Sequence, residues 1–169
     1  MKSLLVILLT VILFTSCQQQ KIGFVDNTKL ISEYQEKKDL ETKLQTKIDA
    51  FQKRTDSLRQ AFQLEINEAE LKARKMSQEN LQKLSQELQQ KEQVLSQRVQ
   101  FDQQQIAKES QSKNDSLIKK IRKFVQDYGK TNGYTFILGS NEAGSVMYGK
   151  DENDLTQTVL DALNKAYNK

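Results

Sequence analysis

The residue with the most evident chemistry in this sequence is its single cysteine, Cys17. A disulfide within one chain needs two cysteines, so this thiol has no intramolecular partner. The chain has no histidine, which excludes a histidine-based triad and a zinc site of the usual cysteine–histidine type. Asp26, Asp151 and Asp154 could gather near one another, but a strand end, a loop and a helix cap explain them better than catalysis does. The sequence therefore predicts a protein that is not an enzyme, with no metal site and no cofactor.

The residues around Cys17 indicate a lipid anchor. A short basic start is followed by an apolar run at 4–14, which is too short to span a bilayer as a helix. Two small residues come next, and after Cys17 the sequence turns polar. This is the pattern of a secretory signal, and it resembles a bacterial lipobox apart from Phe14, where leucine is usual. We expect residues 1–16 to be a lipoprotein-type signal peptide. The alternative is an ordinary signal peptide followed by an incidental cysteine.

Lipidation of Cys17 would determine the cellular location of the protein. Several acyl chains on Cys17 would anchor the chain stably, since each buried CH₂ group contributes about 0.8 kcal/mol. Gln18 stands where aspartate often retains lipoproteins at the inner membrane. We therefore expect a periplasmic lipoprotein that contacts the membrane through Cys17, with the outer membrane favoured over the inner.

A long helical element dominates the rest of the chain. Residues 24–128 contain neither glycine nor proline, the two residues that most often interrupt helices. A continuous helix of that length would reach about 150 Å, and a hairpin about half of that. The hydrophobic fraction is 37%, below the usual level of about 45–50%, and the dense apolar clusters lie near the chain ends. The sequence thus predicts an α+β protein with a small β body and a long helical extension.

We expect the helical extension, residues 35–128, to fold back on itself as an antiparallel hairpin. Apolar residues recur every three or four positions in both halves, so the halves can pair. The best place for the reversal is 73–78, where Ser77 can cap a new helix and Glu79 would lie in its first turn. The alternative is one continuous helix in a parallel coiled coil.

The body is expected to come from both ends of the mature chain. Residues 17–34 would form its N-terminal part, with a strand at 21–26 and a helix that begins at Asn27 or Thr28. Strands from the two chain ends should join one sheet, and this closure favours the hairpin over the continuous helix.

Residues 129–169 would form the C-terminal part of the body. Gly129 and Gly133 are expected to end the long helix. Runs rich in β-formers at 134–138 and 145–148 then predict a β-hairpin.

A short terminal helix should follow, capped by Asp154 with Gln157 as its capping-box partner. The residues expected on its buried face are Leu155, Val159, Leu160, Leu163 and Tyr167.

This order of elements resembles that of the Skp/OmpH family of periplasmic chaperones. Residues 21–26 are similar to the first strand of that family, 76–80 to its arm reversal, and 133–138 to its "Gly-Tyr-x-x-Val-Leu" strand. The most specific match is 154–164, which is close to the terminal signature "Asp-Ile-Thr-x-x-Val-Leu-x-x-Leu-Asn". The resemblance extends from Lys21 to the end of the chain. The anchored N-terminus departs from the best-known members, which are soluble after cleavage.

The resemblance implies a homotrimer in which the bodies form a small barrel-like core. Three helical hairpins would extend from the core, and the cavity between them would hold an unfolded outer-membrane protein without ATP. The family has no catalytic or cofactor-binding residues to transfer. Two other classes compete with this reading. A structural coiled-coil lipoprotein could use the rod as an envelope spacer or scaffold, but it would lack the terminal strands and helix. An adaptor of an export pump would need larger β domains.

The charge distribution does not favour nucleic-acid binding. The formal net charge is +4, from 26 basic and 22 acidic residues of mixed sign. A nucleic-acid interface would need a one-sided basic stripe or stacking aromatic residues. The densest basic cluster is Lys119, Lys120, Arg122 and Lys123. A solvated helix face explains it, with contact to anionic lipid or to an acidic partner as the alternatives.

The apolar side chains of the rod are the predicted client-binding residues, because a two-helix hairpin cannot bury all of them. Each could instead pack between the two helices of its own arm, and Phe101 is the most likely to be exposed because it lies off the apolar stripe. The predicted residues are Phe51, Leu58, Phe62, Ile66, Leu95, Phe101 and Ile106.

Overall fold

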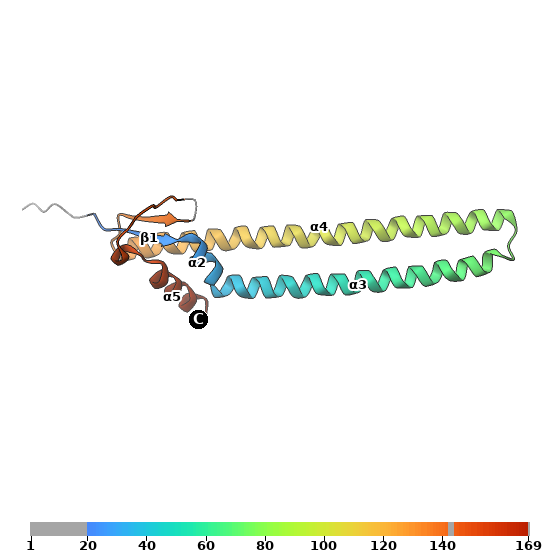
Figure 1. Ribbon diagram of the computed structural model, residues 1–169, viewed down its shortest axis with the longest axis horizontal. Helices are drawn as coiled ribbons and strands as arrows, with labels where there is room; N and C mark the ends of the chain where they lie inside the picture. The colour runs from blue at the N-terminus through green and yellow to red at the C-terminus, as the bar shows by residue number, and fades with distance from the viewer. Residues whose placement is uncertain (1–19, 142–143, 169) are drawn as a thin grey trace, which may run out of the picture.

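The computed structural model describes residues 20–141 and 144–168 and shows a long helical hairpin on a small body (Figure 1). The predicted fold class is therefore confirmed. The predicted signal peptide, residues 1–16, and Cys17 lie outside the described residues. The described N-terminal residues, both strands and the C-terminal helix gather at one end of the molecule, and the helical reversal lies at the other.

Two antiparallel helices form the hairpin. Helix α3, Gln35–Ala73, has 39 residues and helix α4, Gln78–Thr131, has 54, which correspond to lengths of roughly 60 and 80 Å. The chain reverses through residues 74–77. Ser77 is the N-cap of α4 and Glu79 lies in its first turn, although the Ser77 side chain makes no capping hydrogen bond. We use the name arm for residues 35–116, and the name body for the remaining described residues.

The body contains a two-stranded parallel sheet. Strand β1, Ile22–Asp26, pairs with strand β2, Phe136–Ser140, in a register that places Ile22 opposite Phe136 and Asp26 opposite Ser140. Parallel strands need a long crossover connection, and here the whole helical hairpin is that connection. The expectation that strands from the two chain ends join one sheet is confirmed.

The predicted β-hairpin is wrong. In the described part of the loop after β2, residues 145–148 form no strand. Strand β2 instead pairs in parallel with β1, which the returning arm brings beside it. Gly149, which follows this segment, lies against Phe24 of β1: a Cβ atom at Gly149 would lie 2.3 Å from Cε1 of Phe24.

The hydrophobic core lies where the two chain ends meet. Helix α2, Asn27–Glu33, and helix α5, Thr156–Tyr167, pack there against the sheet and the last third of α4. Helix α4 thus continues past the arm into the body. The core consists of Val25, Leu30, Tyr34, Leu117, Ile121, Leu155, Val159, Leu160 and Leu163.

Helix α4 ends one turn later than predicted. Gly129 does not end the helix but lies buried inside it, where a Cβ atom would lie 3.1 Å from Cδ1 of Ile137. The helix ends at Thr131, and Gly133 adopts φ +71°, the left-handed conformation that closes many helices. The amide of Tyr134 donates to the carbonyl of Gly129 at 2.9 Å, and the amide of Gly133 donates to that of Lys130 at 3.3 Å. This is a Schellman motif.

Helix α2 begins at Asn27, one of the two predicted positions, whereas the start of α5 differs from the prediction in detail. Asp26 is the N-cap of α2, and its side chain accepts hydrogen bonds from the amides of Thr28 and Lys29. Leu155, not Asp154, is the N-cap of α5, after a short 3-10 helix, η1, Asp151–Asn153. Asp154 still accepts a hydrogen bond from the Thr156 amide at 2.8 Å.

The capping box predicted for α5 is absent, because Gln157 donates to Asp161 one turn further along the helix. The predicted apolar face of α5 is nevertheless confirmed. Leu155, Val159, Leu160 and Leu163 are buried, and Tyr167 packs against the core.

Candidate client-binding surface and arm joint

The arm buries its apolar side chains only partly. Five of the predicted client-binding residues are half-buried along the contact between α3 and α4. Leu58 and Phe101 are more open, with 40% and 56% of their surface exposed. The half-buried residues are Phe51, Phe62, Ile66, Leu95 and Ile106.

A shallow apolar groove of about 330 Å³ lies at the middle of the arm. Its apolar lining comes from both helices: Leu58, Ala61 and Phe62 of α3, and Val94 and Leu95 of α4. Three of the predicted residues therefore lie together, and Val94 joins them although the sequence reasoning missed it.

Charged side chains from both helices flank this groove. On the side nearer the tip, Lys91 and Glu65 form an ion pair between the helices. On the side nearer the body, Asp102 lies 2.9 Å from Arg54 of α3 and 3.4 Å from Arg98 of its own helix. These pairs join the helices across the arm, and the apolar floor between them stays open to solvent. The groove can therefore accept apolar side chains from outside.

Exposed apolar side chains also extend beyond the groove along both helices of the arm. Leu64 and Leu71 of α3 are exposed, as are Val94 and Phe101 of α4. The members of each pair are seven residues apart, which places them on one face of a helix. This spacing is the signal that could have identified Val94, Leu64 and Leu71 from sequence alone.

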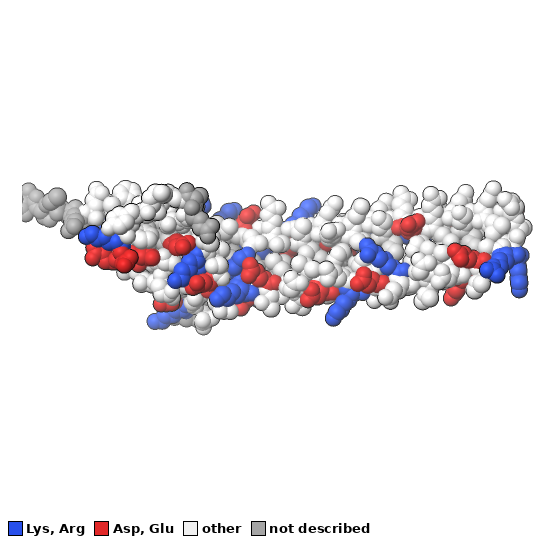
Figure 2. All heavy atoms as spheres, in the orientation of Figure 1, with Lys and Arg blue, Asp and Glu red and all other residues white. Residues whose placement is uncertain are grey.

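Charges of both signs are interspersed along the arm, as Figure 2 shows for one face. The arm thus presents separated apolar spots within a charged surface. A further ion pair, Lys47–Glu109, joins the two helices, and the hydrogen bond from Lys47 holds the pKa of Glu109 below its ordinary value.

The basic cluster does not act as one unit. Lys120 pairs with Glu36, and Lys123 lies 2.9 Å from Asp127. Lys120 and Lys123 of the cluster therefore form ion pairs within the protein. Lys119 and Arg122 are exposed on the helix surface.

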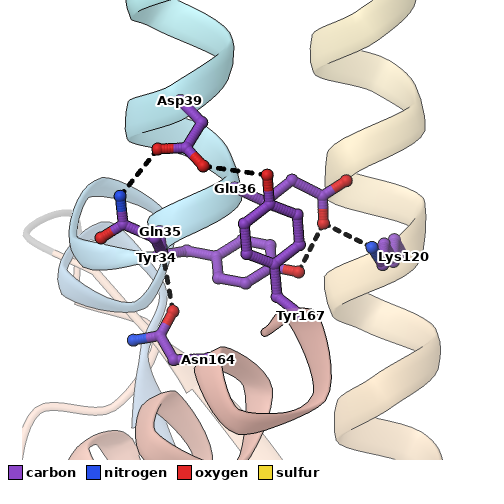
Figure 3. Close-up of polar contacts among 7 residues, drawn as sticks. All are labelled: Tyr34, Gln35, Glu36, Asp39, Lys120, Asn164 and Tyr167. Atoms are coloured by element: carbon purple, nitrogen blue, oxygen red, sulfur yellow. Dashed lines mark hydrogen bonds and ion pairs between the residues drawn. The ribbon is translucent and has the colours of Figure 1, made fainter. Parts of the chain in front are cut away.

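The arm meets the body at a polar joint, which we define as Tyr34, Gln35, Glu36, Asp39, Lys120, Asn164 and Tyr167 (Figure 3). Helix α2 ends at Glu33, and the extended backbone of Tyr34, with ψ 126°, separates it from α3. The Tyr34 side chain is fully buried, and its hydroxyl donates to Glu36 at 2.5 Å. Lys120 of α4 pairs with the same carboxylate. The joint thus connects both helices of the arm to the core.

The electrostatics of the joint favour an ionised Glu36 and a neutral Tyr34. Burial raises the pKa of Glu36, but hydrogen bonds from Lys120 and Tyr34 outweigh it and leave the pKa below its ordinary value. Burial, and then the hydrogen bond to Glu36, raises the pKa of Tyr34. Asp39 accepts hydrogen bonds from Gln35 and Tyr167, which lower its pKa. The network is therefore complete at neutral pH.

The outer face of the body sheet is apolar. Ile22, Phe136 and Leu138 point away from the core and are exposed, while Phe24 beside them is half-buried. Met147 and Tyr148 of the following loop are almost fully exposed. An apolar sheet face of this kind is typical of a surface that another protein covers.

Two negative observations concern residues 20–141 and 144–168 alone. None of their helices combines the length and apolar character that a membrane crossing requires. Their His, Cys, Asp and Glu side chains form no group of three or more that could hold a metal ion.

A parallel sheet whose crossover is a long helical hairpin defines an OmpH-like architecture. Residues 21–163 match the family model for outer membrane protein (OmpH-like), and the chain belongs to this family. A solved structure from Caulobacter crescentus CB15, described as a candidate outer membrane chaperone (OmpH-like), matches with a TM-score of 0.77 and 16% sequence identity. The match covers 89% of this chain and 88% of that one, and at this identity it shows the fold alone. Among curated proteins, none matches the sequence.

Membership of the OmpH-like family confirms the resemblance that the sequence indicated.

Proposed function

We propose that this protein is an ATP-independent holdase that keeps unfolded outer-membrane proteins soluble between its helical arms. The observation that carries the proposal is the open apolar groove at the middle of the arm. A two-helix hairpin has no third element to cover that groove, so its apolar side chains remain available to a client.

Weak contacts at many points suit this task. The groove, the Leu64–Leu71 face and Phe101 are separated by charged and amide side chains, so each can hold only a short apolar stretch of a client. The sum of such contacts gives avidity, while each single contact breaks easily and allows release. The mixed charges keep the arm soluble when it is empty.

The second part of the proposal is a homotrimer. The exposed apolar face of the body sheet and the free edge of a two-stranded sheet both favour burial against further copies. Three bodies joined through these surfaces would extend three arms around one cavity. Light scattering of the mature protein should give the mass of three chains, and the mass of one chain would contradict the cavity.

The third part is the lipid anchor at Cys17. Gln20, the first described residue, lies at the end of the molecule opposite the arm tip. Three residues can span roughly 10 Å at most, so a lipid on Cys17 would hold the body close to the bilayer. The arms would then extend away from the membrane. Mass spectrometry of the protein purified from membranes should find acyl chains on Cys17, and an unmodified thiol would exclude the anchor.

The holding function is tested by diluting an unfolded outer-membrane β-barrel protein from urea into buffer with the mature protein. We expect suppressed light scattering in the absence of nucleotide. Replacing Leu58, Val94 and Phe101 together by serine should abolish most of the protection. The matched control replaces three exposed glutamines, Gln60, Gln90 and Gln105, by serine and should retain it.

Equal protection by both variants would show that the groove does not bind clients. No protection by the unmodified protein would favour the envelope spacer or scaffold as the function instead.

A further inference from the structure

The joint between arm and body contains a contact that the holding function leaves unexplained. Helix α3 begins directly after Tyr34, whose extended backbone interrupts the helix without glycine or proline. The first amide groups of a helix have no partners within the helix. The side chain of Tyr34, the N-cap residue, makes no capping hydrogen bond. The amide of Gln35 instead donates at 2.9 Å to Oδ1 of Asn164, which lies in α5.

A second contact joins α5 to the same turn of α3. The Tyr167 hydroxyl donates to Oδ2 of Asp39 at 2.9 Å, and Gln35 donates to the other oxygen of that carboxylate at 2.7 Å. The Tyr167 ring also packs edge-on against Tyr34, with ring centres 6.0 Å apart and planes at 70°. Helix α5 therefore contacts the start of α3 through two side chains, Asn164 and Tyr167, one helical turn apart (Figure 3).

The arm has room to move just beyond this joint. A crevice of about 520 Å³ separates α3 from α4 there, lined by Leu40, Leu44 and Leu117 among other residues. Polar side chains join the two helices around the crevice: Lys120 pairs with Glu36, Lys37 donates to Asn114 at 2.8 Å, and Lys47 pairs with Glu109. A helix that is fixed at its first turn, and joined to its neighbour across a crevice by long lysine side chains, can pivot about that turn.

We propose that α5 is a latch that sets the opening angle of the arm, by which we mean the angle between the arm and the body. Asn164 and Tyr167 act as positioning residues. In an oligomer the opening angle of the arms sets the volume between them. The latch would thus determine which size of client the protein holds, and this second part rests on the proposed function.

The test uses the complete mature protein and a double variant, Asn164→Ala with Tyr167→Phe. These changes remove one acceptor and one donor and retain the Tyr167 ring in its packing. The matched control, Gln157→Ala with Asp161→Ala, removes a hydrogen bond of α5 that does not involve α3. Small-angle X-ray scattering measures the arm opening, and circular dichroism checks that helix content is unchanged.

We expect the double variant to have a larger radius of gyration and a broader distance distribution than the unmodified protein and the control. The single variant Asn164→Asp replaces the amide oxygen by a carboxylate oxygen that can still accept the Gln35 hydrogen bond. Its dimensions should therefore match those of the unmodified protein, whereas those of Asn164→Ala should be larger. Unchanged dimensions in a fully folded double variant would overturn the latch.

Client size preference is measured with two unfolded β-barrel proteins, one of about eight strands and one of about sixteen. The double variant should shift the ratio of protection severalfold towards the larger client. A changed opening with an unchanged ratio would overturn the role in client selection. If the unmodified protein protects neither client, the proposed function fails, but the scattering comparison still decides whether α5 sets the arm angle.

Discussion

Helix α5 of the body and helix α3 of the arm differ in how deeply they bury their apolar side chains. In α5, Leu163 is 1% exposed and lies in the core, whereas in α3, Leu71 is 63% exposed. Both helices contain apolar residues at helical spacing, so the difference comes from the number of elements around them. Helix α5 packs against strand β1 and helices α2, α3 and α4, whereas beyond its first turns α3 has α4 alone beside it among the described elements (Figure 1). The body should therefore contribute most of the free energy of unfolding, and the arm should provide most of the contacts with clients.

Hydrogen exchange should show the largest difference between the two regions. Amides of β1 and α5 exchange through openings that disrupt the shared core, whereas amides in the middle of α3 can open locally at small cost. We expect the body amides to exchange slower by orders of magnitude when peptides are followed by mass spectrometry. Slower exchange in the arm than in the body would contradict this division of roles.

Core truncation should have the largest effect on the free energy of unfolding. Leu163→Ala removes a fully buried side chain and should cost about 2–5 kcal/mol. Leu71→Ala removes a mostly exposed one and should stay within about 0.5 kcal/mol. Urea denaturation followed by circular dichroism measures both, at one protein concentration because assembly contributes to stability. Equal costs would mean that a partner surface covers Leu71.

The end of α4 offers a backbone test of the body. Gly133 has φ +71° and free space around the position of a Cβ atom, so Gly133→Ala should act through backbone strain alone. We expect a loss of about 1–2 kcal/mol. Asparagine tolerates this conformation better than alanine does, so Gly133→Asn should lose less. Thermal denaturation compares the variants, and an unchanged Gly133→Ala would mean that this helix end contributes little to the body.

Acid should weaken the joint. The folded pKa of Glu36 is lowered, so its contribution to stability is present above its ordinary pKa and is lost as the pH falls through the lowered value. We expect the melting temperature of the unmodified protein to fall in that acidic range. Glu36→Gln should be less stable near neutral pH and show a smaller decrease on acidification. Parallel pH profiles for the two proteins would exclude Glu36 as the responsible group.

The sequence predicted the elements whose signals are local. The absence of glycine and proline indicated the long helices, and helical spacing identified the buried face of α5. It failed where distant residues decide the structure. Residues 134–138 and 145–148 resemble a β-hairpin locally, but the arm brings β1 beside β2. Likewise nothing local marks the break at Tyr34, because the amide after it is capped by Asn164, at the other end of the chain.

The candidate surface was predictable in part for the same reason. Phe101 lies off the apolar stripe and is exposed, as its spacing predicts, and client binding at this residue stays a prediction. Val94 lies outside the apolar stripe that pairs the two helices, so that stripe did not identify it. The joint could not be found from sequence, since its residues come from three helices that only the fold brings together.

The smallest effect on stability should accompany a clear loss of function. Phe101→Ser changes an exposed side chain on one helix, so the free energy of unfolding should change by no more than about 0.5 kcal/mol. Client protection should still decrease, because one contact among many is lost and avidity depends on their number. The matched control is Gln105→Ser, one turn further along α4 and also exposed. Light scattering of a diluted β-barrel client measures protection, and urea denaturation measures stability. If Phe101→Ser instead lost stability and kept full protection, this side chain would contribute to packing, and the separation of stable body from binding arm would not hold at that position.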